Sequence, residues 1–400
     1  MRTGLLFLAM LVAAALAPAA PPAKAPASQP AAALKTYETR YYIILTDLDA
    51  DSAREAGVRM TAMAEEYYQR TRGFSGVIRR KLPFYLFSKK DDYLAAGGPP
   101  NSTGVYNGRS LMAIAGDKTG EHIWHVVQHE GFHQFAYAVI TGRLPTWLNE
   151  GMAEYFGESL FTGNDFVAGI VSPYRLGRLQ TAIRDEKTEP FPQFMNMSGK
   201  EWSSDIAIGN YDQAWSMLHF LVHGDEGKYA GALSAFINDL AGGMGYDAAW
   251  GKSFGRDIAA FEKRWRDYWL EMPAHGSARR YQQATVSTLA GWLGRATSQK
   301  QTFASVEEFF TAAGEDALKH HPEDWLPPSI LRNALGSARR IGQWRMEAAP
   351  GKLPQFICRT SDGAELAGAF GLNGQRVGKV TVTVAEPKPP GGSDTKPAGR

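Results

Sequence analysis

The feature that most constrains this fold is a pair of histidines, His129 and His133, with Glu130 between them. Residues i and i+4 lie on one face of a helix, so both imidazoles can reach one metal ion, with the Glu130 carboxylate beside them. The rest of 126–134 is uncharged, as a buried helix beneath a cleft requires. The same pattern also arises by chance in core helices. It therefore predicts a buried helix over 121–140 that either binds a metal or only packs in the core.

A second segment favours the metal. Glu150 follows His133 by 17 positions and lies in a predicted helix over 146–157. That is enough chain to leave one helix, turn and return antiparallel, which would bring Glu150 to the same ion. Two histidines, one glutamate and an open position match a catalytic rather than a structural zinc site. We expect one zinc ion per chain, with the ligands His129, His133 and Glu150. Glu130 would then be the catalytic base that takes a proton from the attacking water.

The two segments together resemble the gluzincins, the group of thermolysin-like peptidases and zinc aminopeptidases, because the second reads Trp-Leu-Asn-Glu-Gly-Met-Ala-Glu-Tyr-Phe. They are most similar to the secreted bacterial peptidase MA-like proteins. The resemblance is sharp over 121–157, weaker over 37–270, and does not cover the C-terminal part. It implies a zinc metallopeptidase in which Glu154, one turn after Glu150, orients the first histidine through a hydrogen bond. The alternative for Glu154 is a solvated carboxylate on the helix surface.

The resemblance also implies a residue that stabilises the oxyanion of the tetrahedral intermediate, which gluzincins supply as Tyr or His. Tyr211 fits best because it opens a predicted helix after a loop; a core or rim tyrosine is the alternative. His219 and His223 form another i, i+4 pair, but no Glu follows the first, so we interpret them as packing residues. His125 precedes the metal-binding pair by one turn. Zinc needs an open position, so we expect His125 to lie behind the ligands or to face a lid.

The remaining pattern predicts an α+β fold, with a small mixed β-sheet and a gluzincin-type helical lobe. Strands are expected at 41–45, 83–87 and 109–115, with a helix over 51–68. Further helices are expected at 173–185, 211–223, 228–241 and 257–271. We expect the strand at 109–115 to be the edge that pairs with an extended peptide. It lacks the Gly-x-Met-Glu-Asn sequence with which zinc aminopeptidases grip a free amine, which favours an endopeptidase.

A break at 273–276 separates the metallopeptidase domain, 37–272, from a C-terminal α+β region, 277–386. That region is expected to be helical over 282–339, with a capping box of Ser305 and Glu308, and a β-meander over 344–384. Asp-Gly and Asn-Gly pairs, at 362–363 and 373–374, supply the turns of the meander. The Pro/Gly/Lys-rich tail, 387–400, is expected to be disordered.

The N-terminus predicts export. Residues 1–20 combine a basic start, a 13-residue apolar run and small residues, which is typical of a secretory signal peptide. The run is shorter than the roughly 20 residues of a spanning helix, although an uncleaved anchor is the alternative. The Ala/Pro-rich stretch over 21–36 indicates a flexible linker. We therefore expect a periplasmic or secreted protein without stable membrane insertion.

The charge balance gives no sign of a nucleic acid partner, and the cysteine content rules out an intrachain disulfide. The net charge is +2, from 43 basic and 41 acidic residues, so nothing indicates a nucleic acid partner. One cysteine, Cys358, allows no intrachain disulfide.

We predict zinc-dependent hydrolysis of peptide bonds in a peptide or protein substrate. The alternatives are an inactive zinc-binding envelope or scaffold protein of the same fold, and a zinc amidase that acts on cell-wall peptides. The sequence does not indicate the oligomeric state.

Overall fold

A computed structural model describes residues 34–116, 121–140, 144–204, 208–349 and 351–387. The chain divides into two compact units. The first holds the chain up to Leu160 and Ala168–Ser277, and the second holds Phe161–Val167 and the chain from Ala278. The sequence placed its boundary a few residues before Ser277, but it did not predict that 161–167 would group with the C-terminal region. The expected signal peptide, most of the linker and residues 388–400 of the tail lie outside the described residues.

The first unit contains a mixed five-stranded sheet in the order β1-β2-β3-β5-β4. Its strands are β1 (Lys35–Glu38), β2 (Tyr42–Thr46), β3 (Leu82–Phe87), β4 (Gly104–Tyr106) and β5 (Leu111–Ile114). Strands β2, β3 and β5 are parallel, and the short outer strands β1 and β4 pair antiparallel with their neighbours. This confirms the small mixed sheet of the predicted α+β fold.

Two expectations about this sheet are wrong. Strand β5 lies between β3 and β4, so the 109–115 segment has no free edge and cannot be the strand that pairs with a peptide. The edge belongs instead to β4, which is only three residues long and gave no strand pattern in the sequence. The linker was expected to run to Thr36, but Lys35 and Thr36 already pair with β2 as part of β1.

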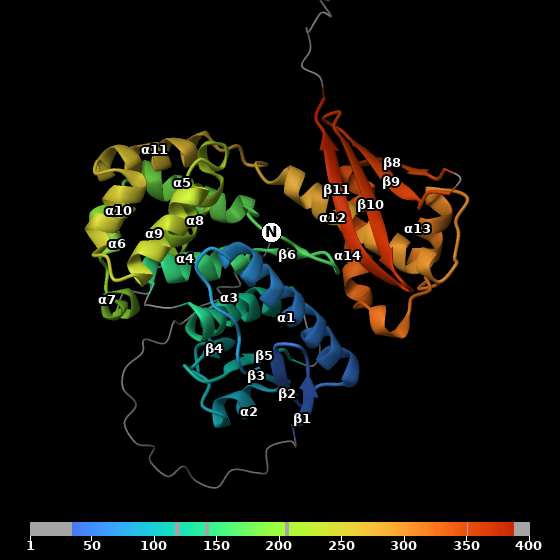
Figure 1. Ribbon diagram of the computed structural model, residues 1–400, viewed down its shortest axis with the longest axis horizontal. Helices are drawn as coiled ribbons and strands as arrows, with labels where there is room; N and C mark the ends of the chain where they lie inside the picture. The colour runs from blue at the N-terminus through green and yellow to red at the C-terminus, as the bar shows by residue number, and fades with distance from the viewer. Residues whose placement is uncertain (1–33, 117–120, 141–143, 205–207, 350, 388–400) are drawn as a thin grey trace, which may run out of the picture. The chain divides into compact units, whose positions relative to one another are not determined.

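Helices cover both faces of the sheet (Figure 1). Successive side chains of a strand alternate in direction, so Phe84 points to one face and Phe87 to the other. On the first face, α1 (Ala50–Thr71) and α3 (Glu121–Val139) pack through an apolar core that includes Phe84. On the second, Phe87 packs with Tyr93 of α2 (Lys90–Ala95). The sheet thereby fixes α3, the helix that carries His129 and His133.

The helical lobe completes the first unit. It consists of α4 (Thr146–Gly157), α5 (Pro173–Arg184), α6 (Phe191–Met195), α7 (Gly199–Ser204), α8 (Ile208–Gly227), α9 (Ala230–Ala241), α10 (Tyr246–Phe254) and α11 (Ile258–Glu271). Helix α8 runs through this lobe and loses regular geometry at Gly224, where the following Asp225 and Glu226 have positive φ. The regular part therefore ends where the sequence predicted. Helices α6, α7 and α10 are additional to the predicted set.

The second unit begins with β6 (Leu160–Phe161) and β7 (Phe166–Val167), a hairpin whose first strand starts at the unit boundary. Its helices are α12 (Ala278–Ser298), α13 (Val306–Gly314) and α14 (Pro328–Ile341), with a 3₁₀ turn at Pro322–Asp324. Its meander, in the order β11-β10-β9-β8, is formed by β8 (Gly342–Glu347), β9 (Gln355–Thr360), β10 (Glu365–Asn373) and β11 (Arg376–Ala385).

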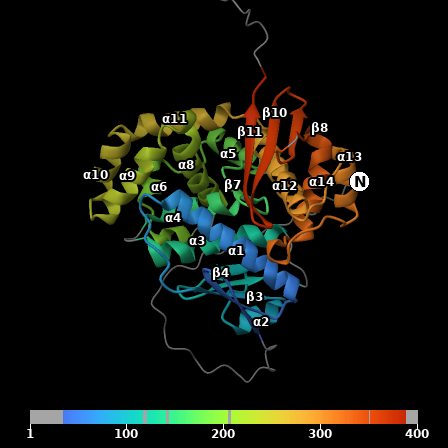
Figure 2. The same cartoon turned by 45° about the vertical axis from the view of Figure 1, so that its right-hand side comes forward.

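The C-terminal prediction of helices followed by a meander is confirmed. Ser305 caps α13 by accepting a hydrogen bond from the backbone N–H of Glu308 at 3.2 Å. Gly363 and Gly374 have positive φ, as the predicted turns require. Helix α12 lies along the meander (Figure 2), and Gly368 allows the close approach because a Cβ there would meet Val286 at 2.6 Å. No helix among the described residues is long and apolar enough to cross a membrane.

Candidate metal centre

Three side chains from two neighbouring helices converge in the first unit. His129 and His133 extend from α3 and Glu150 from α4, and one ligand atom of each lies within 4.8 Å of the others. The two Nε2 atoms are 3.2 Å apart, and Glu150 Oε2 lies 3.5 Å from both. A point equidistant from these three atoms lies about 2.0 Å from each, which is the usual length of a zinc bond to His or Glu.

The buried carboxylate oxygen of this group lacks a hydrogen bond of ordinary geometry. Glu150 Oε2 has no hydrogen-bond partner among the described residues, and the two Nε2 atoms lie 3.5 Å away from it. A buried acceptor left unpaired is costly, so a cation between the three side chains would satisfy an unmet demand. The donor set and its spacing therefore fit zinc.

The pKa shifts of Glu150 and His129 also favour a cation in this site. Burial raises the pKa of Glu150, but the imidazoles of His133 and His129 outweigh it and lower that pKa to about 2. For His129, burial lowers the pKa, but the neighbouring carboxylates of Glu150 and Glu154 outweigh it and raise that pKa to about 10. The buried carboxylates thus favour a positive charge on His129. A metal ion would supply that charge instead and displace the proton from the imidazole.

Helix α4 is held in place by close packing on α8. A Cβ at Gly151 would lie 2.6 Å from the carbonyl oxygen of Ala214, so only glycine allows this approach of the two helix backbones. Since Gly151 directly follows Glu150, the contact fixes how far the Glu150 side chain reaches toward the two histidines. The Glu-Gly pair was visible in the sequence, but its packing role was not predicted.

Glu130 stands beside the three donor atoms. Its Oε2 accepts a hydrogen bond of 2.8 Å from the backbone N–H of Tyr106, at the end of the edge strand β4. The side chain is buried, and the pKa of Glu130 is raised chiefly because burial disfavours the charged form. The hydrogen bond from the sheet thus orients the carboxylate through Oε2. The other oxygen, Oε1, does not take part in that hydrogen bond.

Glu154 lies behind the first histidine. Its Oε1 is 3.2 Å from Nδ1 of His129, on the ring edge opposite Nε2. The side chain is only 3% exposed, so Glu154 is not a solvated surface carboxylate. Glu154 therefore lies beside the imidazole that the resemblance to the gluzincins expects it to orient.

Tyr211 lies in the first turn of α8, with its ring centroid 6.4 Å from that of His129. The residue is 6% exposed, and its hydroxyl has no hydrogen-bond partner among the described residues. The pKa of Tyr211 is raised, first by burial and then by the charge of Glu150. The phenol is therefore protonated at neutral pH, and its hydroxyl is available as a hydrogen-bond donor.

The other histidines lie outside the group of three. The His223 ring is 2.9 Å from the Tyr155 hydroxyl, and the His219 ring is 3.3 Å from the carbonyl of Gly169. Both contacts agree with the predicted packing role. His125 Nε2 is 3.7 Å from a carboxylate oxygen of Glu154 and is not one of the three converging side chains.

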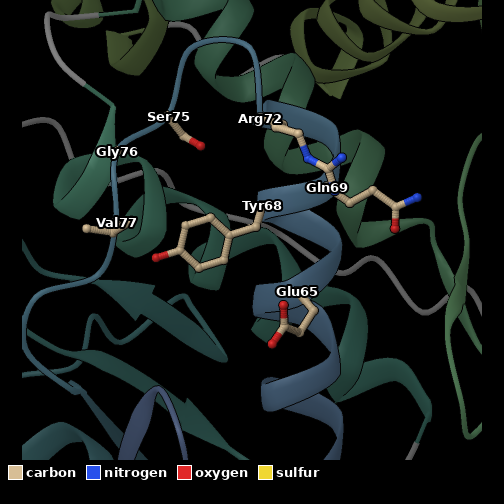
Figure 3. Close-up of a pocket in the computed structure, with 7 residues that line it drawn as sticks. All are labelled: Glu65, Tyr68, Gln69, Arg72, Ser75, Gly76 and Val77. Atoms are coloured by element: carbon tan, nitrogen blue, oxygen red, sulfur yellow. The ribbon is translucent and has the colours of Figure 1, made fainter. Parts of the chain in front are cut away.

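A surface hollow elsewhere in the first unit is distinct from this centre. It lies between the C-terminal half of α1 and the segment that follows it (Figure 3). Its lining residues are Glu65, Tyr68, Gln69, Arg72, Ser75, Gly76 and Val77. None of them belongs to the candidate metal centre.

Comparison with known proteins adds one match. A family model described as "Protein of unknown function (DUF1570)" matches residues 124–241. The chain is thus similar to this family over the segment that contains all of the predicted site residues, from His129 to Tyr211. No curated protein and no solved structure is detectably similar to the chain.

Sequence reasoning missed one part of the centre. Arg175, on α5, contacts Glu154 at 2.7 Å, and Asp212 joins it from α8. These two residues could not be found by their spacing from the histidines. The only sequence signal for them is that charged residues occur in helices that were expected to be buried.

Proposed function

We propose that the protein is a zinc metallopeptidase of gluzincin type that hydrolyses peptide bonds outside the cytoplasm. One zinc ion per chain would be held by His129, His133 and Glu150. The observation that carries this proposal is the spacing of the three donor atoms around one point, with buried Glu130 beside it. Export rests on the signal-like pattern over residues 1–20, which lie outside the described residues.

The chain's own residues divide the chemistry between them. Zinc, when bound, would polarise the carbonyl and lower the pKa of water so that it can attack at neutral pH. Glu130 takes the proton of the attacking water on Oε1, since Oε2 is engaged by Tyr106, and passes it to the leaving amine. Glu154 keeps a proton on Nδ1 of His129, so the Nε2 lone pair faces the donor triangle.

Tyr211 would stabilise the negative oxygen of the tetrahedral intermediate. Its hydroxyl is protonated at neutral pH and lacks a hydrogen-bond partner among the described residues, and its ring lies next to that of His129. A donor held in place before the reaction needs no reorganisation when charge develops on the substrate.

The edge strand β4 allows only short pairing with a substrate. The N–H of Tyr106 is engaged by Glu130, and the hydroxyl of Ser102 contacts both the N–H and the carbonyl of Gly104. We therefore propose that side-chain contacts, rather than an extended β-ladder, contribute most of the substrate binding.

Two other functions use the same site. An inactive zinc-binding protein would need the ligands but not Glu130 or Tyr211, whose burial beside the ligands favours an enzyme. A zinc amidase for cell-wall peptides would differ only in its substrate.

The test uses the full chain loaded with zinc. A mixed peptide library and cell-wall peptide fragments are incubated with wild type and Glu130→Gln, and products are identified by mass spectrometry. Cleavage of library peptides by wild type, lost on chelation and in Glu130→Gln, supports the peptidase. Cleavage of the cell-wall fragments alone favours the amidase, and no cleavage at full zinc occupancy favours the binding protein.

A further inference from the structure

One buried cation joins three carboxylates directly behind the candidate metal centre. The side chain of Arg175 is 6% exposed, and its Nη1 lies 2.7 Å from Glu154 Oε2 and 2.9 Å from Glu158 Oε1. Its Nε lies 2.8 Å from Asp212 Oδ1, and its guanidinium stacks over the ring of Trp215 at 4.7 Å. A single side chain of α5 thus links the end of α4 to the first turn of α8.

Each end of this link leads to a residue of the proposed site. Glu154 contacts Arg175 through one oxygen and His129 through the other, so the carboxylate is shared between guanidinium and imidazole. Asp212 directly follows Tyr211 on α8 and contacts Arg175 from there. One guanidinium therefore contacts both the carboxylate beside His129 and the aspartate next to Tyr211.

We propose that Arg175 is a positioning residue of the zinc site, which acts on the metal through Glu154 and on Tyr211 through Asp212. This inference rests on the proposed function. A buried Glu154 without a cation would carry an uncompensated charge and would lose its fixed aim at His129. A guanidinium spreads its charge over three nitrogens and so pairs with several carboxylates at once, as Arg175 does, whereas a lysine ammonium is a single point charge.

The nearby Arg178 provides a matched control. It makes two hydrogen bonds of 2.8 Å to Asp212 and is more exposed than Arg175, at 36% of its side chain. Its guanidinium also lies over the ring of Tyr174, and among the described residues it forms no ion pair with Glu154. Both arginines thus contact the same aspartate, but only Arg175 reaches the carboxylate behind His129.

The experiment measures zinc affinity by competition with a chelator in the full chain, for wild type, Arg175→Met, Arg175→Lys and Arg178→Met. Loss of a group that orients a metal ligand typically weakens metal binding by about 10–100-fold, so we expect about 10-fold or more for Arg175→Met. Arg175→Lys should recover part of the loss, and Arg178→Met should bind zinc within about twofold of wild type. Cobalt(II) spectra of Arg175→Lys should differ from wild type, because the ligand field changes when His129 is less well aligned.

A double variant decides whether Arg175 acts through Glu154. If it does, Glu154→Gln with Arg175→Met should bind zinc no more weakly than Glu154→Gln alone. Zinc affinities unchanged in both Arg175 variants would overturn the inference, as would equal losses in Arg178→Met or additive losses in the double variant. Thermal unfolding identifies any variant that fails to fold, in which case Arg175→Lys and its cobalt spectrum decide. A wild type that binds no zinc would overturn the proposed function itself, which is a distinguishable result.

Discussion

Replacing Glu130 with glutamine separates catalysis from metal binding. The amide has the shape of the carboxylate, and its oxygen can still accept the 2.8 Å hydrogen bond from the N–H of Tyr106. It cannot take a proton at neutral pH. Since Glu130 is not one of the three converging donors, we expect Glu130→Gln to retain zinc while losing turnover.

The expected loss is about 10²–10⁴-fold in the chemical step, the usual contribution of a general base, or about 2.7–5.5 kcal/mol of activation free energy. The fold should not suffer. Burial opposes the charge of Glu130, and its pKa is raised for that reason. Metal-free Glu130→Gln should therefore unfold at a temperature no lower than wild type, because a neutral amide costs less to bury than a carboxylate.

The assay compares zinc content and single-turnover hydrolysis of a cleaved peptide for wild type, Glu130→Gln and Glu150→Gln. Glu150→Gln should lose zinc and activity together, because it leaves two imidazoles as ligands. If Glu130→Gln loses its metal while Glu150→Gln keeps it, the two roles are reversed. Undiminished hydrolysis by Glu130→Gln would refute the assignment of the base.

Three further outcomes follow from the described contacts. Tyr211→Phe should keep zinc and lose about 10²-fold or more in kcat, as for one oxyanion donor, and an unchanged rate would reduce Tyr211 to a packing residue. Gly151→Ala should lower the free energy of unfolding by roughly 1–3 kcal/mol, because the new Cβ would meet Ala214 at 2.6 Å. As a control, a Cβ at Gly177 would have no atom within 4 Å, so Gly177→Ala should leave the free energy of unfolding, measured by chemical denaturation, unchanged or higher. Equal losses of stability in the two variants would contradict this explanation. Cys358 is buried, which raises its pKa to about 11, so a thiol reagent at pH 8 should react only after denaturation; fast labelling of folded protein would contradict that.

The long elements of the fold could be predicted because their patterns are strong. The segment from Thr146 to Gly157 was predicted as a helix with its observed bounds, since Pro145 directly precedes its first turn. Strand β4, at three residues, and helix α6, at five, are too short for a period to emerge. Tertiary contacts define such short elements, as the hydrogen bond from Tyr106 to Glu130 does for β4.

The candidate ligands could be predicted because helical spacing fixes where their side chains point. Arg175 could not, since its role arises only where three helices meet. The assignment of β5 as the outer strand failed for a related reason. The pattern of Leu111–Ile114 indicates a strand but does not show that Gly104–Tyr106 turns back to pair with it.

Metal content is the most direct test of the central proposal. The full chain is purified, dialysed against dilute zinc and then against zinc-free buffer, and analysed by elemental mass spectrometry beside His133→Ala. We predict one zinc per wild-type chain and its loss in His133→Ala, whose remaining donors are His129 and Glu150. Wild type without zinc, or His133→Ala with its full complement, would contradict the assignment of this site.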